Sequence, residues 1–201
     1  MRLSDSVCGS ISNIDVYDVR FPTSLEKHGS DAIHGDPDYS AVVVIIKTDK
    51  GDEGHGMTFT LGRGNEIVKK AAESFVPFCI GHKLREIFEN FGKFWKSLTC
   101  EEQIRWIGPE KGAVQMAVGG IINSLWDLWA RLEQKPVWRL LVDLNPDEII
   151  SLCDFGWLTD EITKEEAKNI LTELEATKQE RINDIHKNGF PGNDSLLLTI
   201  S

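Results

Sequence analysis

The sequence predicts an α+β fold in which a three-stranded antiparallel sheet packs on a helical layer and is followed by one β/α unit. Three observations lead to this prediction. Strand-like segments occupy the first third of the chain, helical apolar periodicity extends over residues 65–133, and a strand-like run at 149–157 precedes a capped helix. With 201 residues, the chain is long enough to bury a substantial core.

Three segments near the N-terminus have the composition of β-strands. In residues 11–21, apolar side chains alternate in two pairs that are out of phase, which predicts a strand with a bulge between the pairs. Residues 41–49 are rich in valine and isoleucine, and the turn-forming residues 50–56 separate them from residues 57–61. Residues 41–61 are therefore expected to form an antiparallel hairpin.

Helical signals follow the predicted sheet. Apolar residues line one face of a segment that starts after Gly64, and Thr99 with Glu102 has the spacing of a capping box. A longer helix is predicted from about Gly112 to Glu133. Its small residues recur at four-three-four spacing, so that another element can approach closely at Ala113, Ala117, Gly120 and Ser124.

After residue 148 the pattern changes to that of an alternating β/α layer. Residues 149–157 form an apolar run that is typical of a buried strand. Thr163 and Glu166 have capping-box spacing, and Gly189 provides a stop signal for the helix that they begin. The strand and the helix together predict a single β/α unit.

Charge and cysteine content exclude several classes of partner and compartment. The formal net charge of −10 would repel nucleic-acid phosphates and anionic membranes, so neither is expected as a partner. The four cysteines include no C-x-x-C pair, which favours free thiols in a reducing compartment. No stretch approaches the ~18 apolar residues of a membrane span. These features predict a soluble intracellular protein, either mitochondrial or cytosolic.

Residues 123–141, NSLWDLWARLEQKPVWRLL, resemble the end of the N-terminal capping domain of the enolase superfamily. Four further stretches resemble its L-fuconate dehydratase branch: DVRFPTS, HGSDAIHGDPDYS, FTLGRGNEIV and QIRWIGPEKG. The resemblance is nearly continuous from about Ile11 to Phe190. It implies a capping domain at residues 8–148, the first strand and helix of an incomplete TIM-like barrel at residues 149–190, and a divergent tail at residues 191–201.

The same resemblance implies a reaction of carbohydrate catabolism, the dehydration of a sugar acid. In this superfamily a Lys or His base removes the proton next to a carboxylate, and Mg²⁺ stabilises the enediolate that forms. Those residues belong to the barrel, which takes ~250 residues when complete, whereas about 50 follow Glu148. We therefore expect a truncated chain with no catalytic residue and no metal ligand, which is inactive by itself.

The polar segment at residues 24–40 gains a role from the resemblance. In such enzymes, the loop between the first two strands closes over the barrel mouth and contacts the far end of the substrate. The resemblance implies that a sugar acid is contacted by Gly29, Ser30, Asp31 and Tyr39. Without the resemblance, the segment reads as an ordinary solvated loop, and its histidines and aspartates lack the fixed geometry of a metal site.

Two alternatives remain open from the sequence. Residues 61–66, LGRGNE, begin like a phosphate-binding turn but lack its third glycine, so a plain strand-to-helix turn is expected. The chain as a whole could instead be a non-enzymatic isoform. It would then bind its full-length relative or another protein through the helical face that normally packs on the barrel. A homo-oligomer is also compatible with the resemblance.

Overall fold

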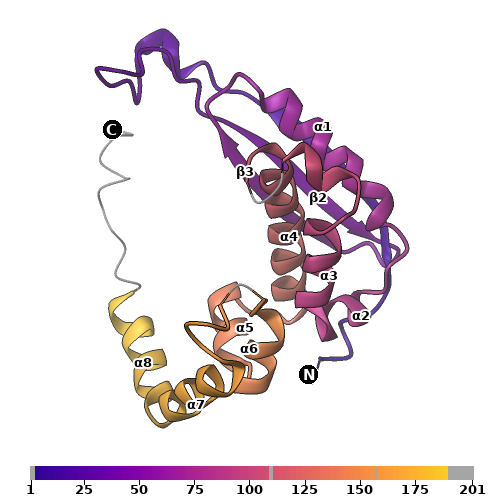
Figure 1. The fold of residues 1–201 in the computed structure, drawn as a ribbon, viewed down its shortest axis with the longest axis vertical. Helices are drawn as coiled ribbons and strands as arrows, with labels where there is room; N and C mark the ends of the chain where they lie inside the picture. The colour runs from indigo at the N-terminus through magenta and orange to yellow at the C-terminus, as the bar shows by residue number, and fades with distance from the viewer. Residues whose placement is uncertain (1–2, 109–110, 157, 190–201) are drawn as a thin grey trace. The chain divides into compact units, whose positions relative to one another are not determined.

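The computed structural model describes residues 3–108, 111–156 and 158–189. The chain divides into two compact units, Met1–Asp143 and Leu144–Ser201. The first unit contains the sheet and the helices that follow it (Figure 1), so it also contains the candidate site.

The sheet has three antiparallel strands in the order β1-β2-β3, with bounds Ile11–Val19 for β1, Ser40–Thr48 for β2 and Glu53–Thr60 for β3. This confirms the predicted sheet and its hairpin (Figure 1). The predicted turn at residues 50–56 is too long, because residues 53–56 pair with β2 as the first half of β3. The register of β1 against β2 is irregular between Ile11 and Asn13 and continuous from Asn13 to Val19. The bulge therefore lies at the start of β1, and its predicted position was wrong because Val19 and Val16 point to opposite sides of the sheet.

Helices follow the sheet in the first unit and cover one of its sides (Figure 1). Their bounds are Asn65–Phe75 for α1, Leu84–Glu89 for α2, Phe91–Thr99 for α3, Ala113–Leu132 for α4 and Val137–Asp143 for α5. The helix predicted after Gly64 and the long helix predicted from about Gly112 are confirmed. Helices α2 and α3 were not predicted, because each is shorter than the window of about 11 residues over which helical periodicity can be recognised.

The packing of α4 on the sheet depends on two glycines of β3. A Cβ atom at Gly54 would overlap the backbone oxygen of Ser124, and a Cβ atom at Gly56 would overlap the backbone oxygen of Gly120. The hydroxyl of Ser124 also donates to the backbone oxygen of Val44 in β2, at 3.0 Å. The close approach predicted for the small-residue face of this helix is therefore confirmed at Gly120 and Ser124.

An aromatic stack fills the space between α2, α3 and α4. The ring centroids of Trp126 and Trp129 lie 5.3 Å apart, and Phe88 stacks on Trp129 at 4.8 Å. Phe91 lies 4.4 Å from Trp126. Burial of such large rings is a major source of stability, so this stack anchors the helical layer to α4.

The segment after α3 differs from its prediction. Thr99 is the last residue of α3, and its hydroxyl donates to the backbone oxygen of Trp95 at 3.2 Å. The carboxylate of Glu101 accepts a hydrogen bond from the N–H of Ile104, at 2.5 Å, where a short 3-10 turn begins. The predicted capping box of Thr99 and Glu102 is therefore wrong, because Thr99 already belongs to the preceding helix.

In the second unit, the described regular structure consists of helices, with α6 at Pro146–Leu152, α7 at Lys164–Leu174 and α8 at Lys178–Asn188. The strand predicted at 149–157, and with it the β/α unit, is wrong over residues 149–156. Asn145 and Glu148 form a reciprocal capping box with two bonds of 2.9 Å, which starts α6 directly before the apolar run. Because no neighbouring strand is described in this unit, the run takes the local helical structure that its cap favours.

The end of the chain follows the prediction in part. Thr163 and Glu166 form the expected capping box at the start of α7. The single helix expected up to Gly189 is interrupted at Glu175–Thr177 by a 3-10 turn, after which α8 continues. Trp157, Phe190 and the tail at residues 191–201 lie outside the described residues. None of the described helices is both long and apolar enough to cross a membrane.

Candidate functional site

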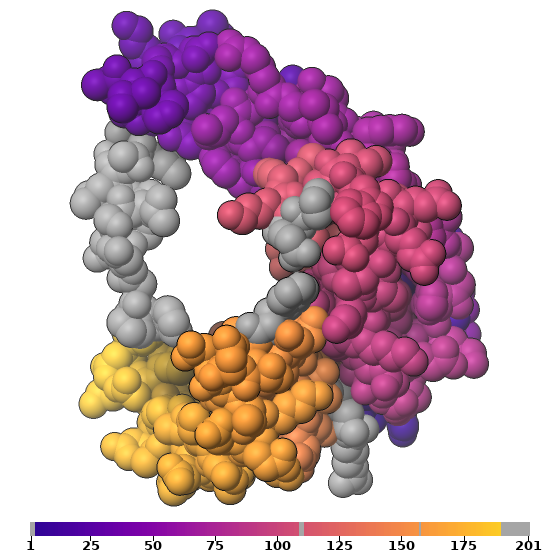
Figure 2. All heavy atoms as spheres, in the orientation of Figure 1, coloured from indigo at the N-terminus to yellow at the C-terminus, as the bar shows by residue number. Residues whose placement is uncertain are grey.

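The candidate site is the loop that joins β1 to β2, residues 20–39. Figure 2 shows this loop, in indigo and violet, as a projection from the first unit. The carboxylate of Asp38 accepts hydrogen bonds from the N–H and the hydroxyl of Ser24, at 3.1 and 2.6 Å. The hydroxyl of Thr23 donates to the backbone oxygen of Pro37 at 2.9 Å. These bonds tie the beginning of the loop to its end, so the loop is folded on itself.

Asp31 organises the tip of the loop. Its carboxylate accepts hydrogen bonds from the N–H groups of Ile33 and His34, both at 2.7 Å, and lies 3.0 Å from Nδ1 of the His34 ring. The backbone bond from His34, then its ring, then the N–H of Ile33 lower the pKa of Asp31 to about 2. The carboxylate is therefore ionised at neutral pH and acts as a hydrogen-bond acceptor.

Gly29 and Tyr39 are in direct contact across the loop. The Tyr39 hydroxyl donates to the backbone oxygen of Gly29 at 3.1 Å, and the Tyr39 ring stacks on Phe59 of β3 with centroids 5.5 Å apart. Gly29 has a φ of +69°, and a Cβ atom there would overlap the Tyr39 ring. Both the backbone conformation and the close approach therefore favour glycine.

The four residues predicted to contact a substrate share this loop but have different partners. The structure brings Tyr39 to Gly29, whereas Ser30 donates its hydroxyl to the backbone oxygen of Gly35 at 3.3 Å and Asp31 is bonded to His34. Hydroxyl donors and a carboxylate acceptor are thus present on one exposed segment. Such groups can bind the hydroxyls of a polyol.

The turn at residues 61–64 borders the loop, a contact that was not among the predictions from the sequence. The N–H of Asp38 donates to the backbone oxygen of Leu61 at 3.3 Å, and Arg63 forms an ion pair with Asp36. Residues 61–64 form the strand-to-helix turn that was expected, but they also place a guanidinium beside the loop. The strand order alone could have predicted this contact. In an antiparallel sheet the first and third strands run in the same direction, so the end of β1 and the end of β3 lie at the same edge.

The residues present do not fit a magnesium ion. Over the described parts of the chain, no three histidine, cysteine, aspartate or glutamate side chains are grouped so that they could hold a metal. The loop histidines each lie beside one carboxylate, His28 at 2.8 Å from Glu26 and His34 at 3.0 Å from Asp31. Mg²⁺ requires near-octahedral oxygen coordination, which these described residues do not provide.

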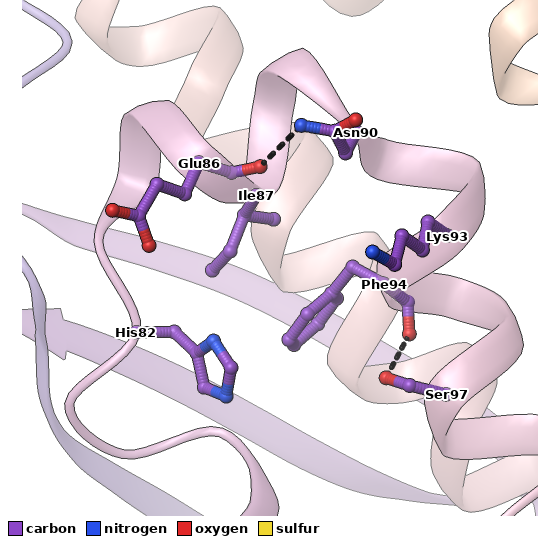
Figure 3. A pocket seen from close by; sticks show the side chains of 7 residues that line it. All are labelled: His82, Glu86, Ile87, Asn90, Lys93, Phe94 and Ser97. Carbon is purple, nitrogen blue, oxygen red and sulfur yellow. Dashed lines mark hydrogen bonds between the residues drawn. The ribbon is translucent and has the colours of Figure 1, made fainter.

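A second concave site lies beside α2 and α3 in the first unit (Figure 3). Its volume is about 320 Å³, and the edge of the His82 ring contacts Phe94 with centroids 5.5 Å apart. Two of its polar side chains, Asn90 and Ser97, donate to backbone oxygens of their own helical segment. These two side chains are therefore already engaged by the helices that carry them.

The family of the chain follows from a direct match. The family described as mandelate racemase / muconate lactonizing enzyme, N-terminal domain, matches residues 18–142, which extend from the end of β1 through α5. The chain belongs to this family. The mandelate racemase and muconate lactonizing enzymes are members of the enolase superfamily, so the resemblance inferred from the sequence is confirmed.

Relatives in this family are much longer than the chain. It is 48% identical over 187 residues to mitochondrial enolase superfamily member 1 of Xenopus laevis, covering 92% of the chain and 42% of that protein. It is 48% identical over 171 residues to L-galactonate dehydratase of Hypocrea jecorina, covering 85% of the chain and 38% of that enzyme. The crystal structure of human mitochondrial enolase superfamily member 1 matches with a TM-score of 0.89 at 46% identity, covering 93% of the chain and 43% of that structure.

Proposed function

We propose that this chain supplies the capping domain of an acid-sugar dehydratase and that its 20–39 loop contacts the substrate through Gly29, Ser30, Asp31 and Tyr39. Family membership and the 48% identity to an L-galactonate dehydratase support the substrate class. The observation that carries the proposal is the loop itself, which presents an ionised carboxylate and hydroxyl donors on one exposed segment.

Two hydrogen bonds within the loop are weak enough to be replaced by hydrogen bonds to a substrate. The hydroxyls of Tyr39 and Ser30 donate over 3.1 and 3.3 Å, which is long for an O–H donor, so little is lost when a substrate oxygen replaces the present acceptor. The carboxylate of Asp31 accepts from sugar hydroxyls, and the glycine at position 29 lets the backbone approach closely. These groups bind and orient the substrate and exclude water, but they do not move its α-proton.

Mg²⁺ and the base are proposed to come from the barrel of a complete family member. Solved structures with the same fold but low sequence identity are described with bound magnesium, which supports the metal for the family. When bound, it would stabilise the enediolate. Residues 8–148 are proposed to be the capping domain and residues 149–190 the start of the barrel domain. Relatives are named mitochondrial, which supports a mitochondrial or cytosolic location.

A chimaera tests the role of the loop. Residues 11–188 of this chain replace the matching part of the human relative, which supplies the barrel, and Asp31→Asn is introduced into the chimaera. The substrates are L-fuconate and L-galactonate, which differ only in the hydroxyl at C6. If Asp31 binds the far end of the substrate, Asp31→Asn raises the KM for L-galactonate about tenfold, as expected for a lost hydrogen bond. The KM for L-fuconate changes less.

The matched control is Asp52→Asn, which removes the same charge from the β2–β3 turn at the other end of the sheet. This variant is expected to keep both KM values. The proposal for the loop is wrong if the two variants behave alike. The unmodified 201-residue chain, assayed with Mg²⁺ and either sugar acid, is expected to give no dehydration product.

One observation favours association with a protein as an alternative function. Trp106 and Ile107 expose 72% and 81% of their surface, which is unusual for adjacent large apolar residues. A chain that associates through them would change its sedimentation when Trp106→Ser and Ile107→Ser are introduced together. A monomer that binds no hydrophobic dye would exclude this alternative.

A further inference from the structure

Asn65 is a fully buried polar residue at the first position of α1. Its amide makes three hydrogen bonds. The Thr60 hydroxyl donates to Oδ1 at 2.7 Å, and Nδ2 donates to the Asp18 carboxylate at 2.5 Å and to the backbone oxygen of Ala41 at 3.1 Å. A buried amide with every bond in place strongly restricts the groups around it.

The two acceptors of Nδ2 flank the 20–39 loop. Asp18 lies two residues before the loop begins, and Ala41 lies two residues after it ends. One nitrogen atom therefore bridges both roots of the loop. Thr60 contributes the end of β3, so the ends of all three strands meet at this side chain.

The hydrogen-bond roles at this position require an amide. Two acceptors face Nδ2, and a hydroxyl that also accepts from the N–H of Gly62 at 3.3 Å donates to Oδ1. Aspartate would place a carboxylate against the Asp18 carboxylate and the Ala41 carbonyl, and leucine would leave all three partners without their bond. The orientation of the amide follows from its partners.

Arg20 adds a second, exposed connection at the same root. Its guanidinium binds Asp18 through two bonds of 2.9 and 2.8 Å and binds Glu66 of α1 at 2.6 Å. The hydrogen bonds from Arg20 lower the pKa of Asp18 most strongly, desolvation by burial raises it by less, and the bond from Asn65 lowers it further. Asp18 is therefore an ionised acceptor for Asn65 at neutral pH.

We propose that Asn65 is the positioning residue of the 20–39 loop: its amide holds the two loop roots, which the pairing of β1 with β2 brings side by side, against the start of α1, and thereby sets the position of Gly29, Ser30, Asp31 and Tyr39. The consequence for a substrate rests on the proposed function. The positioning itself does not, because it concerns the conformation of the loop in the free chain.

Asn65→Asp tests the proposal by hydrogen exchange of the intact 201-residue chain. At about pH 7, the loop amides that have partners within the loop, such as that of His28, exchange about tenfold faster than in the unmodified chain after correction for intrinsic rates. The amides of α4 and of the centre of β2 keep their rates. At about pH 4.5, the introduced carboxyl is protonated and can donate again, because burial and the neighbouring carboxylate raise its pKa, so the difference shrinks.

Two further variants keep the proposal falsifiable. Asn123→Asp introduces the same charge on the exposed side of α4 and is expected to leave loop exchange unchanged. Thr60→Val removes the hydroxyl that orients the amide without adding charge, so loop exchange rises about threefold and does not depend on pH beyond the intrinsic rates. If Asn65→Asp does not fold, the loop exchange rates of Thr60→Val test the proposal instead.

Two outcomes would overturn the proposal. In one, exchange in Asn65→Asp rises equally across the sheet, α4 and the loop, which indicates general destabilisation. In the other, the loop keeps its protection at both pH values. Failure of the substrate proposal looks different, because the Asp31→Asn chimaera would then keep its KM while the loop exchange of Asn65→Asp still rises.

Discussion

Between β3 and α4, two backbones come close because side chains are absent: Gly54 and Gly56 face backbone oxygens of the helix directly. In the 20–39 loop, chain segments come close because polar side chains bond them, as Tyr39 does to the backbone of Gly29 and Asp31 does to the backbone of His34. The first contact is buried, with backbone on both sides. The second is exposed, and its bonds can be replaced by bonds to water or to a ligand. Rigid support and an adaptable binding surface are thus built from different contacts within one unit.

The largest expected effect tests the rigid side of this comparison. Gly56→Ala places a methyl group against the Gly120 backbone oxygen, which cannot rotate away, so β3 and α4 must separate. We expect a loss of about 3 kcal/mol in the free energy of unfolding, measured by urea titration.

Gly119→Ala is the matched control for that change. Gly119 lies in α4 beside Gly120, and a Cβ atom there would meet no neighbouring atom within 4 Å. This variant is expected to be neutral or to gain up to about 1 kcal/mol from helix propensity. Equal losses in the two variants would mean that the close contact is not what limits substitution.

A smaller effect is expected inside the loop from Gly29→Ala. The φ of +69° disfavours alanine, and its methyl group would displace the Tyr39 ring, which is a side chain and can move. We expect a cost of about 1 kcal/mol in unfolding free energy and a change in the NMR signals of the Tyr39 ring. Gly35→Ala, in the same loop with open space around it, should change neither.

The smallest effect concerns the proton equilibrium of Asp31. Its pKa is lowered in the folded chain, so its bonds to the loop are complete above the ordinary carboxyl range and are lost as the pH falls through about 2. An NMR titration of the Asp31 carboxyl carbon should show this midpoint. In His34→Gln the midpoint stays below the ordinary range, because the largest contribution comes from the backbone N–H. An ordinary midpoint in the unmodified chain would show that the tip of the loop is open.

The parts of the fold that the sequence predicts well have long or repeated signals. The hairpin at residues 41–61 combines two β-rich segments with a clear turn, and α4 shows periodicity over its 20 residues. The capping box at Thr163 also forms as its spacing predicts. In these segments, local preference and tertiary packing favour the same structure.

The errors arise where a short signal allows two structures. The apolar run after Glu148 is compatible with either a buried strand or a helix. The reciprocal capping box of Asn145 and Glu148 stabilises the helix, which is the structure that forms. Thr99 has the spacing of a cap but is already the last residue of α3. For the site, the residue types of the loop are visible in the sequence, but the roles of its four residues come from family resemblance and remain predictions. Contacts such as that of Tyr39 with Gly29, ten residues earlier, depend on the folded loop.

The aromatic stack between α2, α3 and α4 also makes the first unit optically distinctive. The planes of Trp126 and Trp129 are inclined by 14° at a centroid separation of 5.3 Å, close enough for the electronic transitions of the two indoles to couple. Coupled indoles with skewed transition moments give a paired positive and negative band in circular dichroism, and this band disappears when the rings separate. Unfolding of the first unit can therefore be followed through its own chromophores, without a label and independently of the helical signal of the second unit.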